Sequence, residues 1–267
     1  MAYLFYCSIL IGIFANTLSL AQGSYTSTKR KLIWSDEFNY VGLPDAKKWN
    51  YETGFIRNQE KQYYTKADYK NVNVKNGNLI ITARKERHKN AEYTSASINT
   101  LKKVDFEGDF RIEIRAKLPY GKGIWPAIWM MGTNIQEMKW PKCAEFDIME
   151  FVGHTPNTIH ANMHWWDAIS TKPDRHSTSG SKTTVKNLHN KYHIYAMERK
   201  GENVRFFVDN LCYFNISAPS TAYKDSFSAP LYLMINTAVG GTWGGPVDDS
   251  IFPQRFLIDY VRAYSLK

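Results

Sequence analysis

The sequence predicts an all-β protein, a sandwich of two antiparallel sheets. Apolar and polar residues alternate with period two along several segments, and turn residues separate these segments. No stretch shows the 3.6-residue period of a capped amphipathic helix. The chain has 267 residues, of which 43% are hydrophobic and 15% aromatic, enough for one sizeable core. Many short strands joined by turns are typical of a β-sandwich.

Each expected strand has a local reason. Residues 72–82 predict a hairpin, because Asn76-Gly77 is the strongest two-residue signal for a tight β-turn. Residues 110–118 alternate cleanly between apolar and polar side chains and stop at Pro119. The same pattern appears in two further segments, residues 192–197 and residues 204–213, the second with a turn at Asp209-Asn210.

The most informative strand has the sequence Glu-Phe-Asp-Ile-Met-Glu, at residues 145–150. Side chains on a strand alternate between the two faces, so Glu145 and Asp147 share one face while Phe146 packs behind it. Glu150 comes one place late for the acidic face. A β-bulge, which inserts one extra residue, would return it there, and bulges are common beside active sites. Three carboxylates on one face raise one another's pKa values, which indicates a functional site.

The segments on both sides of this acidic strand are rich in aromatic residues. Trp125 and Trp129 precede it, and His164 follows it in a segment that also contains two tryptophans. Aromatic rings can stack on the C–H faces of sugar rings, while carboxylates and amides bind sugar hydroxyls. The pattern therefore favours a carbohydrate-binding cleft. The alternatives are an ordinary amphipathic strand with its acids in water, and tryptophans that pack in the core.

Together these segments resemble glycoside hydrolase family 16. The motif from Trp125 to Met130, followed by residues 145–150, is similar to the signature of the bulged, laminarinase-like branch of that family. Further segments match in the family's order, at residues 34–38, 58–65, 76–84, 236–243 and 258–264. The resemblance covers about residues 32–266. It implies a β-jelly-roll, whose two antiparallel sheets bend so that the concave face forms an open substrate cleft.

The resemblance also implies catalytic roles in a retaining double displacement. Glu145 occupies the position of the nucleophile and Glu150 that of the general acid/base. Asp147 lies where the family places a helper carboxylate that hydrogen-bonds the nucleophile. These roles require an ionised Glu145 and a protonated Glu150 before the reaction. No cofactor for catalysis is expected.

Five residues are expected to bind substrate. Trp125 and Trp129 are candidates for stacking on sugar rings. Asn58 matches a cleft-loop amide that binds glucosyl hydroxyls, and Trp243 matches a cleft aromatic residue. His164 is expected on the strand beside the acids.

The resemblance further implies a structural calcium site on the convex side of the protein. The backbone oxygens of Glu37 and Gly77 and the carboxylate of Asp259 would be its ligands, and calcium takes oxygen ligands of this kind. The alternative is that no ion binds and that Asp259 is hydrogen-bonded instead.

The chain departs from the family pattern at two places that bear on specificity or packing. Residues 55–57, Phe-Ile-Arg, replace the Gly-Trp-Gly-Asn style of many laminarinases, and Arg57 could alter a sugar subsite. Arg199 stands where many relatives have Trp. These changes concern linkage preference more than catalysis.

The N-terminal segment predicts export. The first 28 residues carry no charged side chain, residues 3–15 are almost wholly apolar, and Ser19-Leu20-Ala21 is a small-x-small cleavage pattern. We therefore expect a signal peptide at residues 1–21, a single catalytic domain at residues 22–267, and a secreted protein, extracellular or periplasmic, that is not membrane-bound. Two cysteines remain in the mature chain, and both are expected to be reduced.

The formal net charge is +9, but the Lys and Arg residues are scattered and no nucleic-acid motif is present. We expect a monomer whose partner is a β-glucan polysaccharide. The leading hypothesis is an endo-β-1,3-glucanase, with mixed β-1,3-1,4-glucan as a further candidate substrate. One alternative is a hydrolase of algal galactans (agar, carrageenan or porphyran), since a basic surface suits sulfated chains. Another is a non-catalytic, lectin-like β-glucan-binding module, against which the three retained acids argue.

Overall fold

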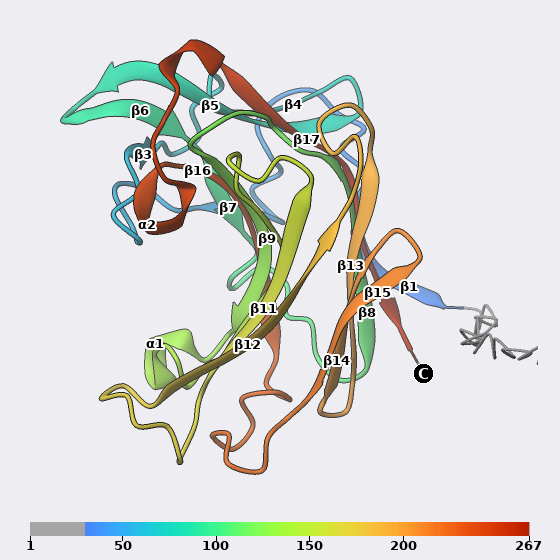
Figure 1. Ribbon diagram of the computed structural model, residues 1–267. Coiled ribbons are helices and arrows are strands. Elements are labelled where there is room, and N and C mark those ends of the chain that lie inside the picture. The colour runs from blue at the N-terminus through green and yellow to red at the C-terminus, as the bar shows by residue number, and fades with distance from the viewer. Residues whose placement is uncertain (1–29, 267) are drawn as a thin grey trace, which may run out of the picture.

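Two stacked sheets make up the computed structural model, which describes residues 30–266 (Figure 1). The seven-stranded sheet contains, in spatial order, β12 (His176–Thr184), β11 (Thr158–Trp166), β10 (Glu145–Phe151), β9 (Ile124–Gly132), β16 (Leu231–Val239), β7 (Ser97–Asn99) and β2 (Asn50–Tyr51).

The second sheet has ten strands. Its main path contains β15 (Leu211–Ser217), β14 (Asn203–Val208), β13 (His193–Lys200), β8 (Phe110–Lys117), β17 (Gln254–Ser265), β5 (Asn78–His88), β6 (Ala91–Ser95) and β3 (Gln62–Tyr64). In addition, β1 (Lys31–Asp36) pairs with β17 and β4 (Val72–Lys75) pairs with β5. The paired strands are antiparallel except for β3 and β6. The predicted fold class is therefore confirmed.

Helical structure within residues 30–266 is limited to single turns. These are α1 (Ile135–Met138), α2 (Gly241–Gly244) and the 3-10 turn η1 (Asp249–Ile251). None of the helices in this part of the chain is long and apolar enough to cross a membrane. The expected signal peptide lies outside the described residues, so its prediction stays open.

The local strand predictions agree with the structure. β4 and β5 form the expected hairpin, and Lys75 faces Asn78 across the turn. Both turn residues, Asn76 and Gly77, have positive φ angles of 54° and 69°, as a tight hairpin turn requires. The segment at residues 110–118 is β8, and the predicted second hairpin is the pair β14 and β15.

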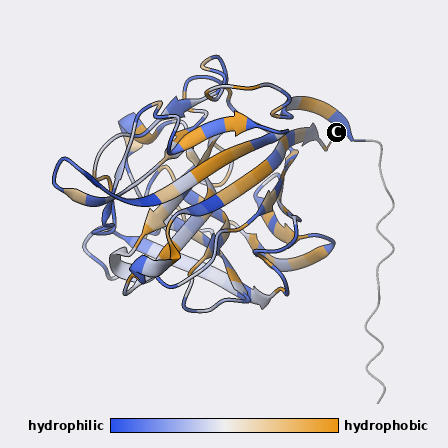
Figure 2. Cartoon of the chain, turned by 90° about the horizontal axis from the view of Figure 1, so that it is seen from above, coloured by the Kyte–Doolittle hydropathy of each residue, from blue (hydrophilic) through white to orange (hydrophobic). Residues whose placement is uncertain are grey.

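The main core lies between the two sheets. On β8, for example, Phe110, Ile112 and Ile114 are fully buried, whereas Glu113 and Arg115 on the opposite face are partly exposed. Hydrophilic and hydrophobic bands alternate along many strands for this reason (Figure 2). On β10, the consecutive residues Ile148 and Met149 both join the main core, which a regular strand would not allow.

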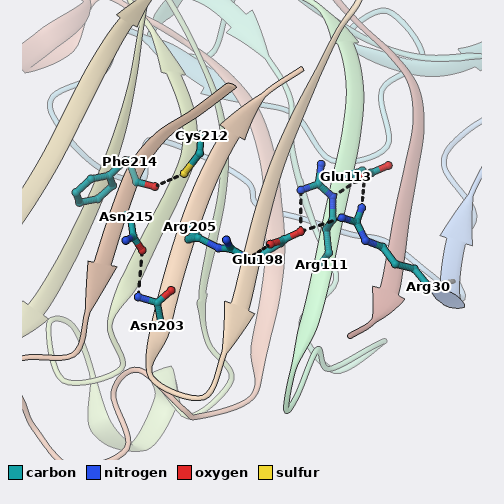
Figure 3. Close-up of polar contacts among 9 residues, drawn as sticks. All are labelled: Arg30, Arg111, Glu113, Glu198, Asn203, Arg205, Cys212, Phe214 and Asn215. Atoms are coloured by element: carbon teal, nitrogen blue, oxygen red, sulfur yellow. Dashed lines mark hydrogen bonds and ion pairs between the residues drawn. The ribbon is translucent and has the colours of Figure 1, made fainter. Parts of the chain in front are cut away.

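The outer face of the ten-stranded sheet carries an ion-pair network (Figure 3). Glu198 is 1% exposed and accepts hydrogen bonds from Arg111 (3.1 Å), Arg205 (2.6 Å) and Arg30 (3.2 Å). Arg111 also donates to Glu113, at 2.5 Å. A buried carboxylate needs such partners because it has lost its water.

Arg199 has a structural role. Its buried guanidinium donates hydrogen bonds to the backbone carbonyls of Phe106 (3.4 Å), Gly108 (3.1 Å) and Ala229 (2.5 Å). Burial lowers the pKa of Arg199 to about 10. This departure from the family pattern therefore ties loops together at one end of the sandwich.

Candidate active site

A β-bulge in β10 brings the three acids to one face, as the sequence predicted. Asp147 pairs with Asn162 of β11, and Glu150 pairs with His160, so three steps along β10 match two along β11. The register with β9 shifts at the same place. The extra residue is accommodated because Ile148 and Met149 both point into the core. Glu150 therefore returns to the face of Glu145 and Asp147.

This face is the floor of a cleft on the side of the seven-stranded sheet away from the main core. The eight residues predicted to act in catalysis or substrate binding all line it: Asn58, Trp125, Trp129, Glu145, Asp147, Glu150, His164 and Trp243. Segments that are far apart in sequence thus converge on the acidic strand.

The three carboxyl groups differ in their partners. Glu150 accepts hydrogen bonds from the Trp125 indole N–H (3.1 Å) and the Asn162 amide (2.8 Å). Asp147 and Glu145 both line the cleft and affect each other's pKa, and two carboxyl groups can share a hydrogen bond only when one carries a proton. The His164 Nε2 atom lies 3.3 Å from Asp147 Oδ2.

Burial raises the pKa of all three acids. Burial first and Asp147 second raise the pKa of Glu145 to about 8. Burial also raises the pKa of Glu150 to about 7, although the bond from Asn162 opposes this change. The pKa of Asp147 lies well above its usual range because of burial and the charge of Glu150. The site therefore retains protons near neutral pH.

Glu145 and Glu150 differ in their hydrogen-bond donors, and this difference bears on the expectation that Glu145 is ionised and Glu150 protonated before the reaction. Glu150 receives two bonds that stabilise its anion, whereas Glu145 lies against another carboxyl group. Mutual repulsion alone, the basis of the expectation, does not decide which acid keeps its proton.

Polar contacts beneath the cleft position Asn58 and Trp129. Asn58 adopts a left-handed conformation with φ 54°, and its amide donates to Glu60 at 3.3 Å. Tyr64 also donates to Glu60 (3.1 Å) and accepts a bond from Asn236 (2.9 Å). Asn236 in turn accepts a bond from the Trp129 indole at 2.8 Å. A continuous chain of bonds therefore connects the loop to β9.

Close backbone packing positions Trp243. The Thr242 N–H donates to the Asn58 carbonyl at 2.9 Å. A Cβ on Gly241 would lie 2.8 Å from the same oxygen, and Gly241 has φ +78°, so this position requires glycine. The Trp243 ring then packs edge-on against Trp125 (centroids 5.5 Å apart) and His160 (4.8 Å).

Arg57 lines the same cleft. Its guanidinium lies 4.9 Å from the Trp129 ring centroid and forms an ion pair with Glu52. The Nη1 atom is buried and has no hydrogen-bond partner within the described residues. The sequence marked Arg57 as a departure from the family pattern that could alter a sugar subsite, but its contact with Trp129 could not be predicted from local sequence.

Two further cleft residues, Trp140 and His176, were not predicted. Trp140 is 40% exposed, and its ring centroid lies 4.6 Å from that of His176. It also lowers the pKa of Glu145, against the larger effect of burial. Trp125 and Trp129 are only 8% and 6% exposed, so Trp140 offers more aromatic surface to a sugar. No local motif marks these two residues, because strand pairing and a loop bring them to the site.

The predicted calcium ligands do not fit a cation site. The Asp259 carboxylate, the only side-chain ligand in the set, pairs with Arg115 at 2.5 Å. The side chain of Glu37 pairs with Arg262 at 2.7 Å, and Gly77 lies in the β4–β5 turn. A calcium ion would have to compete with the Arg115 guanidinium for Asp259. The alternative, a hydrogen-bonded Asp259 without an ion, agrees better with this contact.

Comparison with known proteins identifies the family. The model of glycosyl hydrolases family 16 matches residues 59–262. A β-glucanase of Rhodothermus marinus is 41% identical, over 88% of this chain and 85% of the relative. A keratan-sulfate endo-1,4-β-galactosidase of Sphingobacterium multivorum is 30% identical, over 94% of this chain and 59% of the relative.

Solved structures give the same result. LamA from Zobellia galactanivorans, in complex with laminaritriose and laminaritetraose, matches with a TM-score of 0.79 at 34% identity. The match covers 88% of this chain and 99% of that chain.

Proposed function

The chain belongs to glycosyl hydrolases family 16 and is a glycoside hydrolase, and we propose that it is a secreted, retaining endo-β-1,3-glucanase. The bulged strand β10 carries this proposal, because it places three buried acids on the floor of a cleft lined by aromatic and amide side chains. A laminari-oligosaccharide complex of a similar protein supports the substrate class. We include mixed β-1,3-1,4-glucan as a second substrate.

In the first step, a carboxylate oxygen of Glu145 attacks the anomeric carbon and forms a glycosyl ester. The bond from this carbon to the leaving sugar's oxygen breaks, and that oxygen takes the proton of Glu150. In the second step, ionised Glu150 accepts a proton from water. The water oxygen attacks the anomeric carbon and releases Glu145, so the product retains the β configuration.

The attack requires an ionised Glu145. A protonated Asp147 can donate to Glu145 and thereby stabilise Glu145 as the anion that attacks the sugar. The strongly raised pKa of Asp147 suits this role, and the nearby Trp140 also lowers the pKa of Glu145. Because the pKa of Glu150 is about 7, Glu150 retains its proton in mildly acidic solution.

The contents of the cleft favour a neutral polymer. Acids, tryptophans and amides dominate its lining, and they suit sugar hydroxyls better than sulfate groups. We propose that the enzyme acts as an exported monomer and needs no metal for catalysis. A structural calcium is not part of the proposal, because Asp259 pairs with Arg115.

Hydrolysis of a sulfated galactan is the second candidate. The similar keratan-sulfate galactosidase, the net charge of +9 and the guanidinium of Arg57 in the cleft favour it. Salt distinguishes the two substrates, because ions screen attraction between charged partners. Turnover of neutral laminarin should change little between low and moderate salt, whereas turnover of a sulfated polymer should fall steeply.

The decisive test measures reducing-sugar release from laminarin, lichenan, agarose and carrageenan side by side. We expect release from laminarin, strongly reduced in Glu145→Gln and Glu150→Gln and unchanged in the exposed control Glu92→Gln. Circular dichroism and thermal melting should show that all three variants fold. Release from carrageenan but not laminarin would overturn the substrate assignment. A near-normal rate in either active-site variant would overturn the catalytic roles.

A further inference from the structure

Two histidines connect the surface of the protein to the acidic site. His164 lies on β11 directly opposite Glu145, and His176 lies at the start of the neighbouring strand β12. His164 Nδ1 and His176 Nε2 are 2.9 Å apart, within hydrogen-bond distance. The rings are nearly parallel, with centroids 5.1 Å apart.

A charged side chain lies at each end of this histidine pair. At the outer end, the Lys172 ammonium lies 3.3 Å from His176 Nδ1. At the inner end, His164 Nε2 lies 3.3 Å from Asp147 Oδ2. An ammonium group can only donate hydrogen bonds, and a neutral imidazole has one donor and one acceptor nitrogen. These facts determine which nitrogen of each ring donates and which accepts.

The Lys172 ammonium at the surface determines which ring nitrogen of each histidine carries the proton. Because Lys172 donates, His176 Nδ1 accepts, and His176 carries its proton on Nε2. His176 Nε2 then donates to His164 Nδ1, so His164 also carries its proton on Nε2. That N–H faces Asp147 Oδ2. Burial and the nearby His164 and Lys172 lower the pKa of His176, which agrees with a neutral ring.

Surrounding contacts fix the position of His176. The backbone N–H of His176 donates to the Asp174 carboxylate at 3.0 Å, and its backbone carbonyl accepts a bond from the Ser170 hydroxyl at 3.0 Å. The ring of Trp140 packs beside it. The His176 side chain is therefore held between Lys172 and His164.

We infer that His176 is a positioning residue that fixes the tautomer of His164 and thereby the location of the proton on Asp147. If His164 offers its N–H to Oδ2, the proton of Asp147 resides on Oδ1, from which Asp147 donates to Glu145. Oδ2 is buried and accepts no hydrogen bond within residues 30–266, so a site for this donor exists. Such bonds are often loose before substrate binds and tighten afterwards.

This inference rests on the proposed function for its kinetic test. His176→Ala should lower kcat on laminarin about tenfold and change KM little, because it removes one hydrogen bond that positions His164, and tenfold in rate corresponds to about 1.4 kcal/mol. His176→Gln should recover most of the loss, since its amide can donate to His164 Nδ1. His189→Gln, on a turn outside the cleft, is the matched control and should retain full activity.

The tautomers provide a readout that does not depend on activity. Long-range nitrogen–proton NMR spectra of the wild type at pH 7 should show His164 and His176 both protonated on Nε2 only. In Lys172→Met, this single tautomer should be lost at His176. A proton on Nδ1 of either ring in the wild type would contradict the inferred tautomers and thus the positioning role of His176.

The two proposals can fail separately. If the wild type cleaves laminarin and His176→Ala has normal kcat, the positioning role is wrong while the glucanase assignment remains. If the wild type does not cleave laminarin, the glucanase assignment is wrong, and the NMR spectra still show whether His176 fixes the tautomer of His164.

Discussion

Replacing Glu145 by Gln should stabilise the protein in a pH-dependent way. The pKa of this carboxyl rises to about 8 in the folded state from an ordinary 4.5. Between these values the folded state keeps a proton that the unfolded state has released, so wild-type stability falls as the pH rises through this window. Gln does not titrate, so the variant does not lose stability in this way as the pH rises.

The size of the effect follows from the two pKa values. The difference between about 8 and 4.5, at about 1.4 kcal/mol per pKa unit, gives an upper limit of about 5 kcal/mol at pH 8.5. Part of the rise comes from Asp147, whose own protonation responds when Glu145 is removed. We therefore expect a measured gain of about 2–5 kcal/mol at pH 8.5 and little gain at pH 4.5.

Urea denaturation of the wild type and variant at pH 4.5 and 8.5 measures this difference. Glu92→Gln serves as the control, because Glu92 is exposed and should give the same small difference at both pH values. A Glu145→Gln gain that does not grow with pH would refute the reasoning, because it would mean that Glu145 ionises normally in the folded protein. The test does not require a known substrate.

Other predictions concern the network, the cleft and the metal. Glu198→Gln should cost about 2–4 kcal/mol in urea denaturation, because it leaves the buried guanidinium of Arg111 with less compensating charge; a loss under 0.5 kcal/mol would contradict this. Arg57→Lys should raise KM for laminari-oligosaccharides about tenfold at nearly constant melting temperature, because Lys cannot keep the planar contact with Trp129; unchanged KM would exclude Arg57 from the binding site. EDTA should not change the melting temperature, because Arg115 pairs with the predicted calcium ligand; a clear drop that added calcium reverses would restore the predicted site.

Local sequence was sufficient wherever a single strand or turn determines the structure. The Asn76-Gly77 hairpin and the alternating strand β8 follow from short-range rules of turn geometry and side-chain direction. The bulge follows from the late position of Glu150, which no regular strand could place on the acidic face. The candidate catalytic residues therefore lie within one element that the sequence itself describes.

Features that depend on contacts between distant segments could not be predicted in this way. Arg57 meets Trp129 only because a loop folds over β9, and His176 meets His164 only because β12 pairs with β11. The hydrogen bonds that stabilise the Glu150 anion come from donors on β9 and β11. The pairing of Asp259 with Arg115 likewise joins two strands. Nothing in the local sequence encodes these pairings.

Trapping the covalent intermediate tests the central claim most directly. A 2-deoxy-2-fluoro laminaribiosyl fluoride should form a long-lived ester, because the 2-fluorine slows both formation and hydrolysis of the glycosyl-enzyme, whereas the good leaving group, fluoride, speeds its formation alone. Peptide mapping by mass spectrometry should place the added disaccharide on Glu145, within β10. A label on Glu150, or no label on an enzyme that cleaves laminarin, would contradict the retaining mechanism with Glu145 as nucleophile.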